Sequence, residues 1–309
     1  MEKVIVIVGP TCSGKTKLGL ILAELLNGEI ISADSRQVYK KIDIGTAKPT
    51  QEELRKIRHY FISDIDLDNN FDISLFENKS ELIISNILKN NKLPIVIGGS
   101  GLYIRALIDG IAETADSSNL VRKELLELRN KFGNDFLFNE LIRIDPVSAA
   151  KMLPQNWKRV MRALEVFKLT GQPIWKHHQE QELKRKYNYF QIGLRWDREK
   201  LYKNIDDRVV KMFEAGLVDE VKNILSEGYS KNLNALNTVG YKEVIEFLDG
   251  NISLEKCIEL VKRNSRRYAK RQMTWFNADK RIHWYSIENL DQIKNLANQI
   301  IKEINERKN

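Results

Sequence analysis

Cysteine is scarce in this sequence, and no long apolar segment occurs in it. The two cysteines among 309 residues are Cys12 and Cys257, too few for a disulfide framework or a cysteine-based zinc site. No segment approaches the roughly 18 uninterrupted apolar residues of a membrane span. The given sequence leads directly from its first residues into a strand-like segment, so we expect no signal peptide. We therefore expect a cytoplasmic protein with no membrane association.

The composition is that of an ordinary globular protein with a basic surplus. Hydrophobic residues make up 42% of the chain and charged residues 30%, and the length allows one large domain or two modest ones. The net charge of +8 and the pI of about 9.2 suggest an anionic partner. This argument is weak by itself, because lysine-rich surfaces are common and the positions of the charges matter more than their sum.

A phosphate-binding loop opens the chain. A β-branched apolar segment at 3–8 precedes the loop, and residues 17–27 follow it with apolar side chains at helical spacing, so the G-x-x-x-x-G-K-[ST] pattern stands in the strand-loop-helix context it requires. The glycines let backbone N–H groups converge on phosphate oxygens, Lys15 supplies a positive charge, and the hydroxyl of Thr16 can ligate Mg²⁺. The sequence therefore predicts a site for a di- or triphosphate. Its eight residues are Gly9, Pro10, Thr11, Cys12, Ser13, Gly14, Lys15 and Thr16.

Short apolar strands alternate with helices in the first hundred residues. Residues 29–32 and 94–97 read as strands, and residues 73–89 read as a helix whose apolar stripe includes Leu82. This order favours the α/β class, with a P-loop NTPase-like doubly wound parallel sheet. Ligands of such sheets bind beyond the carboxyl ends of the strands, where the phosphate loop and the segments after residues 32 and 97 would meet.

The middle of the chain changes character. Residues 114–187 contain no convincing strand, and helical stretches dominate at 120–132 and 157–170. Strand periodicity returns at 190–196. We therefore predict a helical insertion domain at 114–189 within a core domain formed by 1–113 and 190–309.

The last third of the chain returns to the alternating pattern. Asp197 is a predicted N-cap for a helix that runs through Arg208 toward Leu225. Residues 281–287 read as a final strand before a polar terminal helix.

Asp34 follows the second predicted strand directly. A carboxylate there has two common roles, holding Mg²⁺ through water or accepting a proton from a nucleophile, while a simple turn or N-cap aspartate fits its position equally well. The run Asp34, Ser35, Arg36 and Gln37 offers a carboxylate, a hydroxyl, a guanidinium and an amide that could hold a nucleobase edge. In the glycine-rich turn 98–101, Ser100 could donate to a phosphate oxygen, although a tight connection that needs glycine only for its conformation is the better interpretation.

A basic stretch at 262–271 is the strongest charged feature. Val261, Tyr268 and Trp275 can turn toward the core, and no acidic residue interrupts the run. We therefore expect a stripe for a nucleic-acid backbone rather than a salt-bridged surface helix. The basic residues that share a helical face are Arg263, Arg266, Arg267, Lys270 and Arg271. A smaller cluster in the insertion consists of Lys158, Arg159 and Arg162.

Together these motifs resemble the tRNA dimethylallyltransferase family, the isopentenyl transferases of tRNA. The resemblance spans about residues 3–285, and the motifs stand in the order typical of the family. The matching stretches are 9–16, 34–39, 45–49, 98–103, 145–146, 162–165, 170–173, 239–243 and 268–276.

The resemblance implies a reaction and roles for individual residues. A dimethylallyl group would pass from dimethylallyl diphosphate, bound with Mg²⁺, to N6 of the adenosine next to the anticodon in tRNAs that read codons beginning with U. Asp34 would be the general base, Ser100 would replace a threonine that contacts the reacting groups, and Arg208 would help neutralise the leaving diphosphate. We expect a monomer. The positions that align with tRNA contacts are Asp34, Ser35, Arg36, Gln37, Ser100, Arg122, Lys158, Arg159, Val160, Met161 and Arg162.

Two other functions stay open on the sequence. A prenyl transferase of free adenine nucleotides would need neither the insertion nor the basic stretch, and a P-loop kinase of small molecules would leave both without a role. Four positions depart from the family pattern: Cys12, Ser100, Asn156 and Asn237. The last two affect expected tRNA and insertion-domain contacts rather than the reaction.

Overall fold

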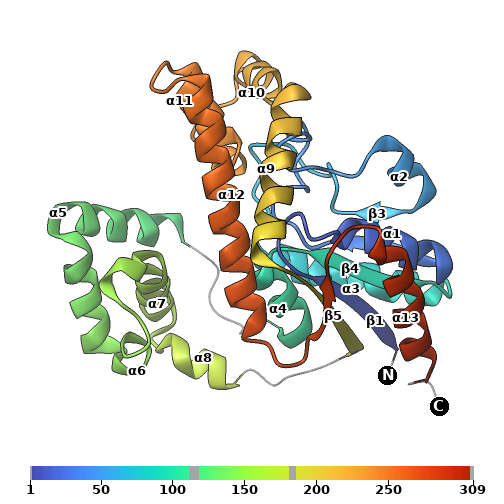
Figure 1. Cartoon of the computed structure of the whole chain (residues 1–309). Coiled ribbons are helices and arrows are strands. Elements are labelled where there is room, and N and C mark those ends of the chain that lie inside the picture. The colour runs from blue at the N-terminus through green and yellow to red at the C-terminus, as the bar shows by residue number, and fades with distance from the viewer. Residues whose placement is uncertain (1, 111–117, 181–185, 307–309) are drawn as a thin grey trace. The chain divides into compact units, whose positions relative to one another are not determined.

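The computed structural model describes residues 2–110, 118–180 and 186–306 (Figure 1). The chain divides into two compact units, residues 1–108 with 185–309, and residues 109–184. The predicted domain boundary at 113/114 lies outside the described residues. The predicted boundary at 189/190 falls inside strand β5, Asn188–Trp196, so the insertion as predicted from the sequence ran two residues into the sheet.

A six-stranded parallel sheet forms the centre of the first unit, in the order β3-β2-β4-β1-β5-β6. This topology confirms the predicted α/β class. The two-residue strand β3 was not predicted, because two residues cannot display an alternating pattern. The strands are β1 Lys3–Val8, β2 Gly28–Ser32, β3 His59–Tyr60, β4 Leu93–Gly98, β5 Asn188–Trp196 and β6 His283–Ile287.

Helices cover both faces of this sheet (Figure 1). Along β1, Val4, Val6 and Val8 belong to one buried cluster while Ile5 and Ile7 belong to the other, as the two-residue repeat of a strand requires. The valine side packs against α3 Ile73–Lys89, α4 Gly101–Asp109 and α12 Leu254–Asn277. The isoleucine side packs against α1 Lys15–Leu25 and α13 Gln292–Glu306. Burial on both faces explains why the strands read as continuous apolar runs.

Helix α3 begins and ends at the predicted residues. Asp72 caps its N-terminus by accepting a hydrogen bond from the backbone N–H of Leu75 at 2.9 Å. Its buried face carries Phe76, Ile84 and Ile87, whereas Leu82 is 68% exposed. The assignment of Leu82 to the apolar stripe was wrong, because a residue two positions before the buried Ile84 is rotated by about 200° and lies on the opposite side of a helix with 3.6 residues per turn.

The helix predicted from Asp197 to Leu225 is two helices, α9 Arg198–Glu214 and α10 Leu217–Ser226. Asp197 caps α9 as predicted, since its Oδ1 accepts hydrogen bonds from the backbone N–H groups of residues 199 and 200 at 3.0 and 3.1 Å. The chain turns at Gly216, whose φ of +93° an α-helix cannot accommodate. The remaining helical elements of this unit are α2 Gln51–Lys56, the 3₁₀ turn Asn234–Leu236 and α11 Tyr241–Leu248.

The second unit contains helices and no strands among residues 118–180. Its core includes Leu137, Leu141 and Leu164, and α7 has the bounds that the sequence predicted. No helix among the described residues of either unit is long and apolar enough to cross a membrane. The elements of the second unit are α5 Asn119–Ile144, interrupted at Gly133, α6 Pro146–Ala149, the 3₁₀ turn Pro154–Asn156, α7 Trp157–Thr170 and α8 Ile174–Glu180.

Candidate active site

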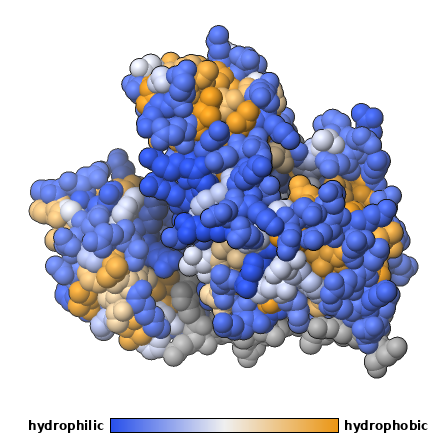
Figure 2. Space-filling model, viewed as in Figure 1, coloured by the Kyte–Doolittle hydropathy of each residue, from blue (hydrophilic) through white to orange (hydrophobic). Residues whose placement is uncertain are grey.

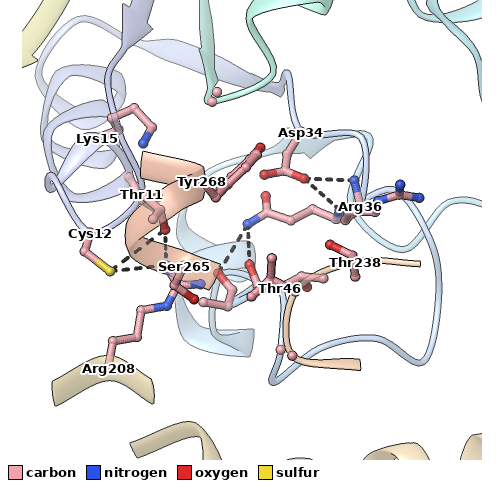
Figure 3. Close-up of a pocket in the computed structure, with 18 of the residues that line it drawn as sticks. Thr11, Cys12, Lys15, Asp34, Arg36, Thr46, Arg208, Thr238, Ser265 and Tyr268 are labelled. Carbon is pink, nitrogen blue, oxygen red and sulfur yellow. Dashed lines mark hydrogen bonds between the residues drawn. The ribbon is translucent and has the colours of Figure 1, made fainter. Parts of the chain in front are cut away.

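A cavity of about 500 Å³ opens at the carboxyl edge of the sheet in the first unit. The phosphate loop after β1, the segment after β2 and the glycine turn after β4 all line it, as do one face of α9 and one face of α12 (Figure 3). The expectation that these segments meet is confirmed. On α12, Val261, Ser265, Tyr268 and Gln272 follow each other in steps of four and three, which is the repeat of a single helical face, and Arg271 lines the cavity beside Gln272.

The phosphate loop is held rigidly at the start of α1. Gly14 precedes the helix with φ +87°, a conformation that favours glycine and lets the loop turn into the helix. The indole Nε1 of Trp196 donates to the carbonyl oxygen of Ser13 at 3.0 Å. The hydroxyl of Ser13 is buried without a hydrogen-bond partner among the described residues, so it can still donate to a phosphate oxygen.

Lys15 lies within this loop, and its ammonium donates to the carbonyl oxygen of Pro10 at 2.6 Å. Burial lowers the pKa of Lys15 to about 8, and the positive charge of Arg208 acts in the same direction, while Cys12 and Asp34 oppose the shift. A bound anion would favour the charged form of this lysine.

Arg208 reaches the same loop from α9. Its Nη1 donates to the hydroxyl of Thr11 at 2.8 Å and contacts Sγ of Cys12 at 3.7 Å. Two cationic side chains, Lys15 and Arg208, therefore border the phosphate loop from different elements. The role of Arg208 toward a leaving diphosphate stays a prediction.

Asp34 is a turn aspartate that also lines the cavity. Its Oδ1 accepts hydrogen bonds from the backbone N–H groups of Arg36 at 2.8 Å and Gln37 at 3.4 Å, which makes it a turn aspartate. Asp34 also lines the cavity, and no partner of its Oδ2 is found among the described residues. One oxygen therefore fixes the carboxylate while the other remains available to accept a proton.

The side chains of Arg36 and Gln37, which follow Asp34, form hydrogen bonds with neighbouring loops. The guanidinium of Arg36 donates to the carbonyl oxygen of Asn234 at 2.7 Å. Nε2 of Gln37 donates to the carbonyl oxygens of Thr46 and Ala47, both at 3.2 Å. These two side chains tie the segment after β2 to the loops around it.

Ser100 contacts the same segment from the glycine turn after β4. Its hydroxyl accepts a hydrogen bond from the backbone N–H of Ser35 at 3.1 Å, and the residue is not part of the cavity lining. The contact fits the interpretation of a tight connection between strand and helix. A direct role of Ser100 in the reaction stays a prediction.

Gln272 of α12 joins two of these loops, a role that the sequence does not reveal. Its Oε1 accepts from the backbone N–H of Thr11 at 2.8 Å, and its Nε2 donates to the carbonyl oxygen of Gly99 at 3.0 Å. The side chain is 5% exposed. A Cβ at Gly99 would collide with Nε2 of Gln272, so only glycine permits this approach. The one signal in the sequence was the position of Gln272 in the matching stretch 268–276.

The sequence model of the IPP transferase family matches residues 37–279 of this chain. The chain belongs to this family. A tRNA dimethylallyltransferase from Alkaliphilus oremlandii is 46% identical over 303 residues, which cover 98% of this chain and 97% of the relative.

Two solved structures are also similar along the chain. One is a tRNA isopentenylpyrophosphate transferase from Bacillus halodurans, with 39% identity and a TM-score of 0.73, covering 100% of this chain and 98% of the other. The second is a eukaryotic dimethylallyltransferase acting on tRNA, with 31% identity and a TM-score of 0.84, covering 97% of this chain and 78% of the other. The resemblance that the sequence motifs indicated is confirmed.

The basic helix of this IPP transferase differs from the expected unpaired stripe. Nη1 of Arg266 donates to Oδ1 and Oδ2 of Asp206 at 2.5 and 2.7 Å. The expectation was wrong for this residue, because its acidic partner lies on α9 and not within the basic run. Arg267, Lys270 and Arg271 are exposed, and Figure 2 shows hydrophilic side chains where α12 crosses the visible face. The half-buried Arg263 has a buried Nε with no partner among the described residues.

In the second unit, Glu165 forms ion pairs with two of the arginines that were predicted to contact tRNA. The carboxylate is 1% exposed and accepts from Nε of Arg122 at 3.0 Å, from Nη1 of Arg162 at 2.7 Å and from the backbone N–H of Ser118 at 2.8 Å. Burial alone would raise the pKa of Glu165, but these donors outweigh it and hold the pKa below the ordinary value.

Of the other residues of this unit that were predicted to contact tRNA, two are buried and two are exposed. Val160 is 0% and Met161 9% exposed within the core of the unit. Their side chains pack α7 against the rest of the unit, and a tRNA contact at these two positions stays a prediction. Lys158 and Arg159 are exposed and stay predicted contacts.

Proposed function

We propose that this IPP transferase moves a dimethylallyl group from dimethylallyl diphosphate to N6 of the adenosine next to the anticodon of tRNA. Family membership supports the class of reaction. The observation that carries the proposal is that the phosphate loop and Asp34 border one cavity, so a diphosphate donor and a proton acceptor can serve the same substrate pair. tRNAs that read codons beginning with U are the proposed substrates.

The chemistry requires this pairing of groups. A neutral aromatic amine is a weak nucleophile, so the allylic carbon must become cationic as the diphosphate departs. Lys15, Arg208 and the backbone N–H groups of the loop stabilise the departing negative charge, and electrostatic stabilisation of this kind commonly contributes most to the rate enhancement of an enzyme. Asp34 accepts the proton that N6 loses when the C–N bond forms. A walled cavity also keeps water from the allylic carbon.

Mg²⁺ fits the same loop. Thr16 is exposed and lines the cavity, and hydroxyl oxygens such as its own are among the oxygen ligands that Mg²⁺ takes together with substrate phosphates. When bound there, the metal would neutralise part of the charge on the diphosphate.

The tRNA-binding surface follows from the exposed cations. On α12 these are Arg267, Lys270 and Arg271, and on α7 they are Lys158 and Arg159. Contacts with phosphates supply most of the affinity for nucleic acid. The target base must leave the anticodon stack to reach the cavity, at a cost of a few kcal/mol. Because one chain lines the whole cavity, we propose that the enzyme acts as a monomer.

The test is to incubate the protein with dimethylallyl diphosphate, Mg²⁺ and unmodified tRNA, and then to determine the masses of the digested nucleosides. We expect an adenosine heavier by one dimethylallyl group. Asp34→Ala should abolish the product while tRNA affinity stays near normal, and Asp68→Ala, which alters an exposed aspartate, should leave both unchanged.

Two results would refute the proposal. Transfer to free AMP without product on tRNA would identify a nucleotide prenyl transferase. Phosphorylation of a small acceptor by ATP, with no prenyl transfer to either substrate, would identify a kinase. Near-normal rates for Asp34→Ala would remove that residue as the base and leave the reaction itself intact.

A further inference from the structure

Tyr268 is the only phenylalanine, tyrosine or tryptophan among the described residues that line the cavity. It stands on α12 one turn before Gln272, so both side chains leave the helix on the same side. Figure 3 shows the Tyr268 ring between the phosphate-loop residues Thr11 and Lys15 and the carboxylate of Asp34. The ring therefore occupies the region between the predicted leaving-group site and the predicted base.

Electrostatic contacts support this location of the ring. Burial raises the pKa of the Tyr268 phenol to about 12, and the charge of Asp34 acts in the same direction, while Arg36, Arg271 and a hydrogen bond with Gln272 oppose the shift. The hydroxyl thus lies close to both Asp34 and the amide that binds the phosphate loop. It is neutral at physiological pH, so the side chain presents an uncharged aromatic ring to the cavity.

The proposed reaction creates a positive charge at this place. The C–O bond to the diphosphate breaks with its electron pair leaving on oxygen, the lone pair of N6 forms the new C–N bond, and the N6 proton passes to Asp34. Between these events the dimethylallyl group carries cationic character. The face of an aromatic ring is negative and attracts a cation within about 6 Å of the ring centroid.

We propose that the ring of Tyr268 is a catalytic group that stabilises the dimethylallyl cation through its π face. The inference rests on the proposed prenyl transfer and adds a residue to it. The guanidinium of Arg271 lies 5.8 Å from the ring centroid, near the outer limit of a cation–π contact, so the protein's own cation engages the ring only weakly. The dimethylallyl cation is a second partner for the ring, which the reaction supplies.

The experiment compares variants at position 268 in single-turnover reactions, with enzyme in excess over radiolabelled dimethylallyl diphosphate and with saturating tRNA. Tyr268→Phe keeps the ring and loses the hydroxyl, and Tyr268→Leu loses the ring. A graded series places phenylalanine with one, two and three ring fluorines at the same position, which weakens the π face with little change in shape. Tyr285→Leu is the matched control, because that tyrosine lies on β6 outside the cavity lining and its hydroxyl bonds to Glu303.

We expect the Phe variant to stay within about 3-fold of the wild-type rate and the Leu variant to fall about 10- to 30-fold, the size of a desolvated cation–π contact. The rate should fall steadily with each added fluorine, while the KM for donor and for tRNA, measured in separate steady-state assays, stays near normal. A purely structural wall would not respond to fluorination.

Three results would overturn the inference. They are a flat fluorine series, a Phe variant as slow as the Leu variant, or a Leu variant that changes only KM. Absence of prenylated tRNA with wild-type enzyme would instead refute the proposed function, before any variant is compared. Normal tRNA binding and an unchanged unfolding midpoint for the fluorinated variants exclude misfolding as the cause of a lower rate.

Discussion

Removing the Gln272 side chain should uncouple the phosphate loop from the glycine turn after β4. Its amide bonds to two backbone groups, accepting from the Thr11 N–H at 2.8 Å and donating to the Gly99 carbonyl oxygen at 3.0 Å, and it is almost fully buried. Gln272→Ala leaves both backbone groups without a protein partner. Each buried group that loses its partner costs about 1–3 kcal/mol, reduced where water enters the space.

The expected loss of unfolding free energy is therefore about 2–4 kcal/mol. The effect on catalysis is separate, because Gln272 fixes the phosphate loop relative to the glycine turn, whose Ser100 in turn holds the segment of Asp34. A displacement of about 1 Å between reacting groups costs on the order of 10²-fold in rate. We expect the kcat/KM for dimethylallyl diphosphate to fall about 10- to 100-fold, with most of the loss in kcat.

The assay is steady-state prenylation of tRNA with varied donor, together with denaturant unfolding of each variant. Gln272→Glu tests the mechanism, because a carboxylate still accepts from Thr11 but has no donor for Gly99, so it should be no better than alanine. Gln299→Ala is the control, since that glutamine is exposed and donates to Glu303 on its own helix at 3.0 Å. A Gln272→Ala enzyme with normal kcat/KM would refute the view that this bridge sets the catalytic geometry.

Other features of the structure lead to further predictions. Burial lowers the pKa of Lys15 to about 8, so this side chain is charged below pH 8 and loses its charge above it. The affinity for the donor, measured by calorimetry, should be constant up to about pH 8 and then fall by up to tenfold per pH unit. Constant affinity up to pH 9.5 would contradict this. Arg267→Ala should lower the slope of log affinity for tRNA against log salt by about 0.7–0.9, whereas Arg266→Ala should change it less because Asp206 already neutralises that charge; equal slopes would contradict this. Glu165→Ala should lower the unfolding free energy by about 2–3 kcal/mol. This is low for a broken buried ion pair, because Arg122 and Arg162 both reach solvent. A chemical denaturation midpoint equal to that of the wild type would contradict this.

Much of the fold could be predicted because its elements carry their own local signals. Strand β1 and helices α3 and α7 have the bounds expected from periodicity and flanking residues. The break at Gly216 was missed, since one glycine inside a polar helical pattern also fits a continuous helix. The position of Leu82 was missed because an apolar residue on a helix can face solvent at little cost.

The candidate site likewise has parts that local sequence signals predict and parts that they do not. The phosphate loop and Asp34 follow strands directly, so the rule that ligands bind beyond carboxyl ends brings them together without a structure. Gln272 bonds to partners 261 and 173 residues away, and Asp206 meets Arg266 across 60 residues. No local pattern reveals pairings of this kind, because tertiary packing alone decides which helical faces meet.

In helix α12 the packing that the sequence does not reveal also determines function. The sequence presents residues 262–271 as a single basic stripe, but the helix divides its side chains among three surroundings. Cys257 and Phe276 pack in the core, Tyr268 and Gln272 line the cavity, and Arg267 and Lys270 are exposed. A helix is a rigid element. RNA phosphates bound to its exposed face would therefore be held at a fixed position relative to the residues of the same helix that border the reacting atoms. A cation added to the exposed face should therefore raise affinity, whereas a change at Tyr268 or Gln272 should alter rate, although the positions are adjacent in sequence.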